Sequence, residues 1–76
     1  MKINLKGLSN TELAKLFDRA AKADDRHLAK TIVYRLAYRH HGSFEAQLRY
    51  LGKRAVKRKD YQSFNMVAKL WKEKGK

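Results

Sequence analysis

The sequence predicts an all-α protein in which four short helices form two helical hairpins after a short extended N-terminal segment. Three observations support this fold class. The 76 residues include no proline, apolar residues recur at helical spacing in four separate stripes, and good N-cap residues stand at the breaks between stripes. We expect one domain over residues 1–76, with an arm at 1–8, a first hairpin at 9–41 and a second, more basic hairpin at 43–74.

The first hairpin begins with a capping box. Ser9 offers a hydroxyl to the backbone, and Glu12 follows three positions later. The apolar stripe of the first helix is Leu13, Leu16, Phe17 and Ala20. A second stripe, out of phase with the first, consists of Leu28 or Ala29 with Ile32, Val33 and Leu36. The chain must therefore turn between the stripes, at Asp24-Asp25, and we expect helices near 10–23 and 25–41.

The second hairpin has the same plan. Gly42 is suited to a C-cap and Ser43 to the next N-cap. The third stripe is Phe44, Leu48, Leu51 and Ala55, and the fourth, nearly opposite in phase, is Phe64, Val67, Ala68 and Trp71. Asp60 stands at the break between them, which predicts helices near 44–58 and 60–74.

A shift of 35 residues places the first hairpin on the second. Leu13, Leu16, Arg19, Ala20, Lys22 and Asp25 then coincide with Leu48, Leu51, Arg54, Ala55, Lys57 and Asp60. Phe17 and Ala29 become Gly52 and Phe64, an exchange that would keep the core volume if these positions faced each other. The period is close to that of tetratricopeptide repeats, but the Trp, Gly and Pro of that signature are not at the expected places.

The first half of the chain also carries features of another family. Lys2 to Lys6 alternate polar and apolar residues, and Arg26-x-Leu28-x-x-x-Ile32-Val33-x-Arg35-Leu36 follows. This half resembles a ribbon-helix-helix DNA-binding domain. The resemblance implies that two chains pair their strands and place Lys2, Asn4 and Lys6 on base edges. Gly7-Leu8 lengthens the link to the first helix, no Gly-containing turn precedes the second, and Asp24-Asp25 would repel a phosphate at its N-terminus.

The charge of the chain indicates the class of its partner. The formal net charge is +12, and five of the seven residues from Lys53 to Lys59 are basic. Such an excess opposes compaction of a small domain, whereas Lys and Arg bind a phosphate backbone by releasing its counterions. We therefore expect a small basic nucleic-acid-binding protein, a regulatory or accessory factor that slightly favours DNA over RNA because a rigid helical face fits the major groove.

The candidate contacts lie mainly on the third helix. Lys53, Arg54, Lys57 and Arg58 recur at i, i+1, i+4 and i+5, and Arg49 and Lys59 extend the row. Supporting cations are Arg35, Arg39, Lys69, Lys72, Lys74 and Lys76. Tyr50, Tyr34 and Tyr38 stand among these cations, where aromatic rings can stack on unpaired bases. For Tyr34 and Tyr38, packing of one hairpin on the other is an alternative.

A second function class is open. The chain could be a regulator or adaptor that docks on an acidic partner protein through apolar surface around Phe64, Met66 and Trp71. Both the ribbon and the repeat interpretations are compatible with a homodimer. No catalytic motif, metal site or cofactor site is evident, and His40-His41 point about 100° apart on a helix, which prevents joint chelation. The lack of cysteine and of long apolar runs favours a cytoplasmic protein with no membrane partner.

Overall fold

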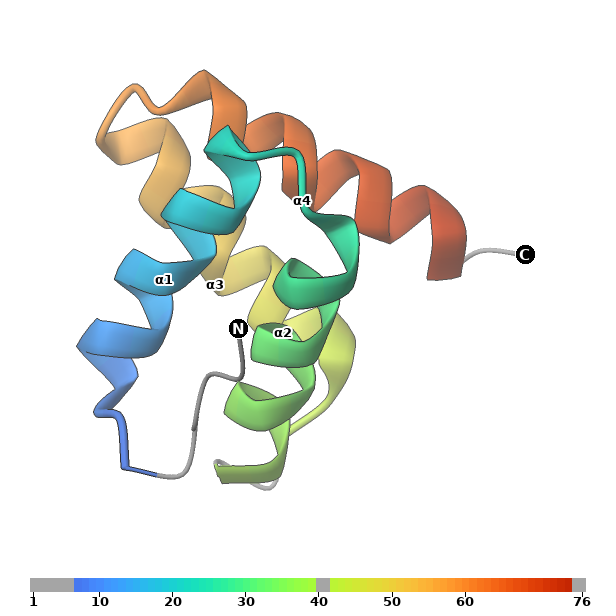
Figure 1. Cartoon of the computed structure of the whole chain (residues 1–76). Coiled ribbons are helices and arrows are strands. Elements are labelled where there is room, and N and C mark those ends of the chain that lie inside the picture. The colour runs from blue at the N-terminus through green and yellow to red at the C-terminus, as the bar shows by residue number, and fades with distance from the viewer. Residues whose placement is uncertain (1–6, 40–41, 75–76) are drawn as a thin grey trace.

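The computed structural model describes residues 7–39 and 42–74, and over these residues the chain is all-α. The helices are α1 (Asn10–Lys22), α2 (Arg26–Arg39), α3 (Phe44–Lys57) and α4 (Tyr61–Lys74) (Figure 1). The predicted fold class and the four predicted helices are confirmed, with bounds that agree to within two residues. The predicted N-terminal strand at 2–6, the His40-His41 pair and Lys76 lie outside the described residues.

The helix starts follow the predicted capping residues. The Ser9 hydroxyl accepts a hydrogen bond from the Glu12 backbone N–H at 3.2 Å, and Glu12 Oε1 accepts one from the Ser9 N–H at 3.0 Å. The Ser43 hydroxyl accepts from the Ala46 N–H at 3.0 Å. These bonds satisfy N–H groups that have no partner within their helix. Residues close together in the sequence therefore determine where α1 and α3 begin.

The 35-residue repeat is visible in the two turns within the hairpins. Asp24 and Lys59 occupy the same position of the repeat, and both adopt the left-handed conformation, with φ of 54° and 57°. One residue later, the carboxylates of Asp25 and Asp60 accept from the N–H groups of Leu28 and Ser63. The N–H groups of Asp25 and Asp60 close each turn by donating to Ala20 and Ala55. Equivalent residues therefore build equivalent helix ends.

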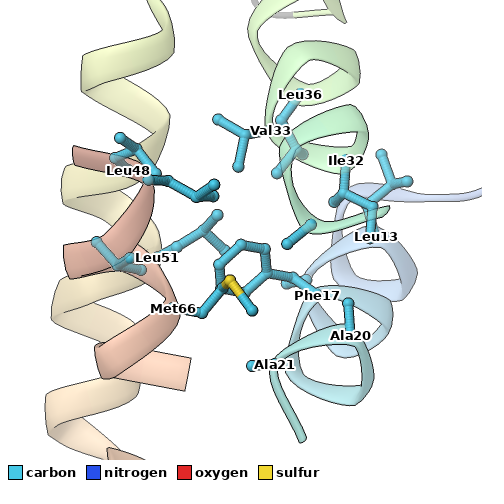
Figure 2. Packing of buried hydrophobic residues seen from close by; sticks show 14 residues of the cluster. Leu13, Phe17, Ala20, Ala21, Ile32, Val33, Leu36, Leu48, Leu51 and Met66 are labelled. Carbon is cyan, nitrogen blue, oxygen red and sulfur yellow. The ribbon is translucent and has the colours of Figure 1, made fainter. Parts of the chain in front are cut away.

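The two hairpins pack on each other around one core. α1 packs on α2 and α3 on α4, and the hairpins meet through α1 with α4, α2 with α3, and α2 with α4. Figure 2 shows Phe17 of α1 directed toward Leu51 of α3 and Met66 of α4, with Val33 and Ile32 of α2 above it in this view. Phe17, Met66 and Leu51 are at most 2% exposed. Burial of these side chains from both hairpins joins the molecule into one unit.

Of the apolar stripe predicted for α4, Val67 is buried as expected, but the other three residues are not. The buried residues of α4 are Ser63, Met66, Val67 and Leu70, whereas Phe64 is 44% and Trp71 39% exposed and Ala68 is exposed. The reason is that α4 turns its Met66 and Leu70 side into the core shared with the first hairpin, whereas Phe64 and Trp71 lie at the groove beside α3. Met66 is therefore core, and not part of an apolar surface open to a partner. None of the described helices is long and apolar enough to cross a membrane.

Candidate nucleic-acid interface

The outer face of α3 gathers four of the predicted binding residues. Its inner positions, which are Leu48, Leu51, Gly52 and Ala55, are buried. Its exposed positions recur every three or four residues and are Ala46, Arg49, Tyr50, Lys53, Val56 and Lys57. Arg49, Tyr50, Lys53 and Lys57 thus share one solvent-facing side of a regular helix, which we call the basic face.

The basic face is poorly neutralised. Among the described residues, the ion pairs of the protein engage Arg26, Lys30, Arg54, Arg58 and Lys69. Arg49, Lys53 and Lys57 of the basic face, and Lys59 in the turn after α3, make no ion pair with any carboxylate of that part of the chain. Their fields therefore add along α3, and a surface of one sign attracts a polyanion.

Arg54 and Arg58 turn away from the basic face. Arg54 Nη1 donates to Asp18 Oδ2 of α1 at 2.8 Å, and Arg58 Nη1 also donates to this oxygen. Asp18 is buried, and its other oxygen lies 2.9 Å from the Ser63 hydroxyl of α4. Because adjacent helical residues point about 100° apart, the predicted row of four divides into an outward pair, Lys53 and Lys57, and an inward pair. The inward pair joins α3 to α1.

Asp60 is a second carboxylate at this junction. Ser63 Oγ lies 2.8 Å from Asp60 Oδ2 as well as near Asp18, and its single proton can serve only one of them at a time. Burial alone would raise the pKa of Asp60. Hydrogen bonds from the Ser63 hydroxyl and N–H, and the charges of Arg58 and Lys22, outweigh burial and lower that pKa. Asp60 is thus held ionised at the start of α4, where the helix dipole favours a negative charge.

The predicted residues on α2 form a separate group. The Tyr34 ring packs on Phe44 of α3, with centroids 4.7 Å apart, and Tyr38 is 75% exposed with the Arg35 guanidinium 5.5 Å from its ring centroid. Arg39 Nη1 lies 3.5 Å from Asn10 Oδ1 of α1. Tyr34 therefore contributes to packing between the hairpins, and none of these contacts links the α2 group to the basic face.

The C-terminal cations are also dispersed. Lys69 Nζ donates to Asp24 Oδ1 at 2.9 Å, so this lysine is paired with the first turn. The adjacent carboxylate of Glu73 lies 3.8 Å from both Arg26 Nη1 and Lys30 Nζ. Lys72 is exposed on α4. Among the predicted binding residues, exposed cations outside the printed ion pairs thus gather mainly in the 49–59 segment, whereas Lys15, Arg19 and Lys22 are further exposed cations on α1.

An apolar groove runs beside the basic face, between α3 and α4. It has a volume of about 480 Å³ and is lined by Leu48, Gly52, Val56, Phe64, Val67 and Trp71, with Arg49, Lys53 and Lys57 at its rim. The Arg49 guanidinium lies 5.9 Å from the Trp71 ring centroid, which is within cation–π range. At the floor of the groove, a Cβ added at Gly52 would make an ordinary van der Waals contact with Val67 Cγ1 at 3.5 Å.

Two features of the site escaped the sequence analysis. An apolar surface around Phe64 and Trp71 was expected, but its place between α3 and α4 was missed because α4 was also assigned the wrong buried face. Asp18 was missed because its partners Arg54, Arg58 and Ser63 lie at least 36 residues further along the chain, and helix periodicity does not indicate such contacts. The described residues contain no cluster of three His, Cys, Asp or Glu able to hold a metal ion. No protein-family model, curated protein or solved structure matches the chain.

Proposed function

We propose that the protein binds nucleic acid, duplex DNA in preference to RNA, through the basic face of α3. The observation that carries the proposal is the row of Arg49, Lys53 and Lys57 on one exposed helix side, without an ion pair in the described part of the chain. A rigid helix presenting such a row fits the width of a DNA major groove and meets phosphates along it.

The roles of the predicted residues differ under this proposal. Arg49, Lys53, Lys57 and Lys59 contact phosphates, and Tyr50, which is 48% exposed, lies among them. Arg54 and Arg58 act mainly through Asp18 by fixing α3 on α1. Arg35, Arg39, Tyr34 and Tyr38 are secondary, because they lie on α2. Binding of this kind is dominated by charge, so modest sequence preference is expected.

The test compares two triple variants that lose the same net charge. The first replaces the basic face, Arg49→Gln, Lys53→Gln and Lys57→Gln. The control replaces three cations that already face carboxylates, Arg26→Gln, Lys30→Gln and Lys69→Gln. Affinity for a labelled DNA duplex, a matched RNA duplex and a single-stranded RNA is measured by fluorescence anisotropy between about 50 and 200 mM salt.

The wild type should bind the DNA duplex most tightly, with an affinity that falls steeply with salt. The basic-face variant should lose at least about tenfold in affinity and flatten the salt slope by roughly 2 to 3, since each phosphate contact contributes about 0.9. The control variant should retain most of the affinity and most of the salt slope. Equal losses in the two variants would show that only net charge matters, and weak binding to all three ligands would overturn the proposal.

A further inference from the structure

We infer that the α3–α4 groove is a docking site for an acidic amphipathic helix of a partner protein. The inference does not depend on nucleic-acid binding, because it rests on the apolar lining of the groove, on the repeat and on the charges at the groove rim. Phe64 and Trp71 are large side chains of the same groove wall, and they remain 44% and 39% exposed. Apolar side chains gathered in a concave surface are typical of a helix-in-groove interface.

The repeat shows what kind of element covers this surface. The positions 35 residues before the groove lining are Leu13, Phe17, Ala21, Ala29, Ile32 and Leu36, and all six are buried. They form the surface of the first hairpin on which the second hairpin packs, with α4 against both α1 and α2. The equivalent surface of the second hairpin is the groove, where Phe64 and Trp71 stay exposed in the described part of the chain. The natural occupant is therefore another helix.

The charge of the occupant follows from the same comparison. In the first hairpin, Asp18 stands at the covered surface and is met by Arg54 and by the Ser63 hydroxyl of the second hairpin. The equivalent residue at the groove is Lys53, which has the opposite charge. With Arg49 and Lys57 beside it, the rim carries three positive charges. A partner helix must bring carboxylates to these positions to match them.

A second copy of this chain does not meet that requirement. If two grooves faced each other, Arg49, Lys53 and Lys57 of both copies would be brought together. If two copies stacked as the two hairpins do, the first hairpin of the next copy would cover the groove. Its Arg19 is the repeat equivalent of Arg54, and Lys53 is the equivalent of Asp18, so Arg19 would approach Lys53. Both arrangements juxtapose like charges, which disfavours association.

The experiment uses a synthetic peptide designed from the helix that covers the first hairpin. Its sequence is that of residues 60–74 with S63E, K69E and K72E, so that the Met66–Leu70 stripe is kept and a carboxylate is offered to Lys53. A scrambled peptide of the same composition and a peptide without the three changes are the controls. Binding to the full-length protein is measured by fluorescence anisotropy, and its oligomeric state by sedimentation velocity.

The acidic peptide should bind saturably, at least tenfold more tightly than either control peptide. Phe64→Gln leaves the charge unchanged and should weaken this binding at least tenfold, whereas Tyr61→Gln, an exposed aromatic residue of the same helix outside the groove, should leave it within twofold. Binding of DNA should be within twofold of wild type in both variants, which separates this inference from the proposed function. Far-UV circular dichroism checks that each variant is folded.

Three results would overturn the inference. One is equal binding of the acidic and scrambled peptides, which would indicate charge attraction without a groove. Another is binding that Phe64→Gln does not change. The third is a concentration-dependent dimer of the wild type that Phe64→Gln dissociates, which would make a second copy the occupant of the groove.

Discussion

Asp18→Ala should be among the most destabilising single changes at a polar residue of this protein. The side chain lies between the hairpins and accepts from Arg54, Arg58 and Ser63. A hydrogen bond to a charged group is worth about 1.5–3 kcal/mol. The contribution of Arg58 to stability is small because that side chain is 51% exposed. Loss of the Ser63 hydrogen bond also costs little, because the Ser63 hydroxyl can donate to Asp60 instead. The expected loss of stability therefore comes mainly from the hydrogen bond with Arg54, whose side chain is 19% exposed.

We therefore expect Asp18→Ala to lower the free energy of unfolding by about 2–3 kcal/mol, which corresponds to a fall in melting temperature of roughly 10–20 °C for a domain of this size. Urea titrations followed by Trp71 fluorescence and by far-UV circular dichroism measure the change. Arg58→Ala should cost less than about 1 kcal/mol, because its charge is half in water.

The double variant Asp18→Ala/Arg54→Met tests the cause of the loss. Part of the cost of Asp18→Ala is the charge of Arg54 left without its partner, so removing that charge should recover part of the stability. The explanation would be refuted by a loss below about 0.5 kcal/mol for Asp18→Ala, by Arg58→Ala costing more than Asp18→Ala, or by strictly additive effects in the double variant.

Four further outcomes are expected. Because folding lowers the pKa of Asp60, its contribution to stability is present above the ordinary pKa of 3.8 and is lost as the pH falls through the folded value. Asp60→Asn should therefore flatten the acid side of a plot of urea midpoint against pH. Lys59→Gly should stabilise the protein by about 0.5–1 kcal/mol in urea titrations, because glycine adopts a φ of 57° without strain. Ser9→Ala should cost about 1 kcal/mol in the same assay through loss of the capping box. Since the groove rim and the basic face share Lys53 and Lys57, unlabelled DNA should displace the labelled acidic peptide; simultaneous binding of both would show that the two surfaces are separate.

The sequence determined the local structure of this protein. The helices start at Ser9, Asp25, Ser43 and Asp60, whose side chains each accept a hydrogen bond from the N–H group three residues later, and such contacts depend on neighbours in the chain alone. The 35-residue repeat was visible for the same reason, because equivalent residues make equivalent turns. The concentration of positive charge in the segment 49–59 is likewise a property of composition.

Tertiary structure decided how the helix faces are used. Phe64, Met66 and Trp71 are all apolar, so their spacing fits two buried faces of α4, and only the position of the first hairpin buries Met66 and leaves the other two at the surface. Tertiary packing also divides the predicted row of basic residues. Arg54 faces inward because it pairs with Asp18, which lies on another helix. Contacts between residues 36 positions apart depend on packing, and periodicity in a single helix does not specify them.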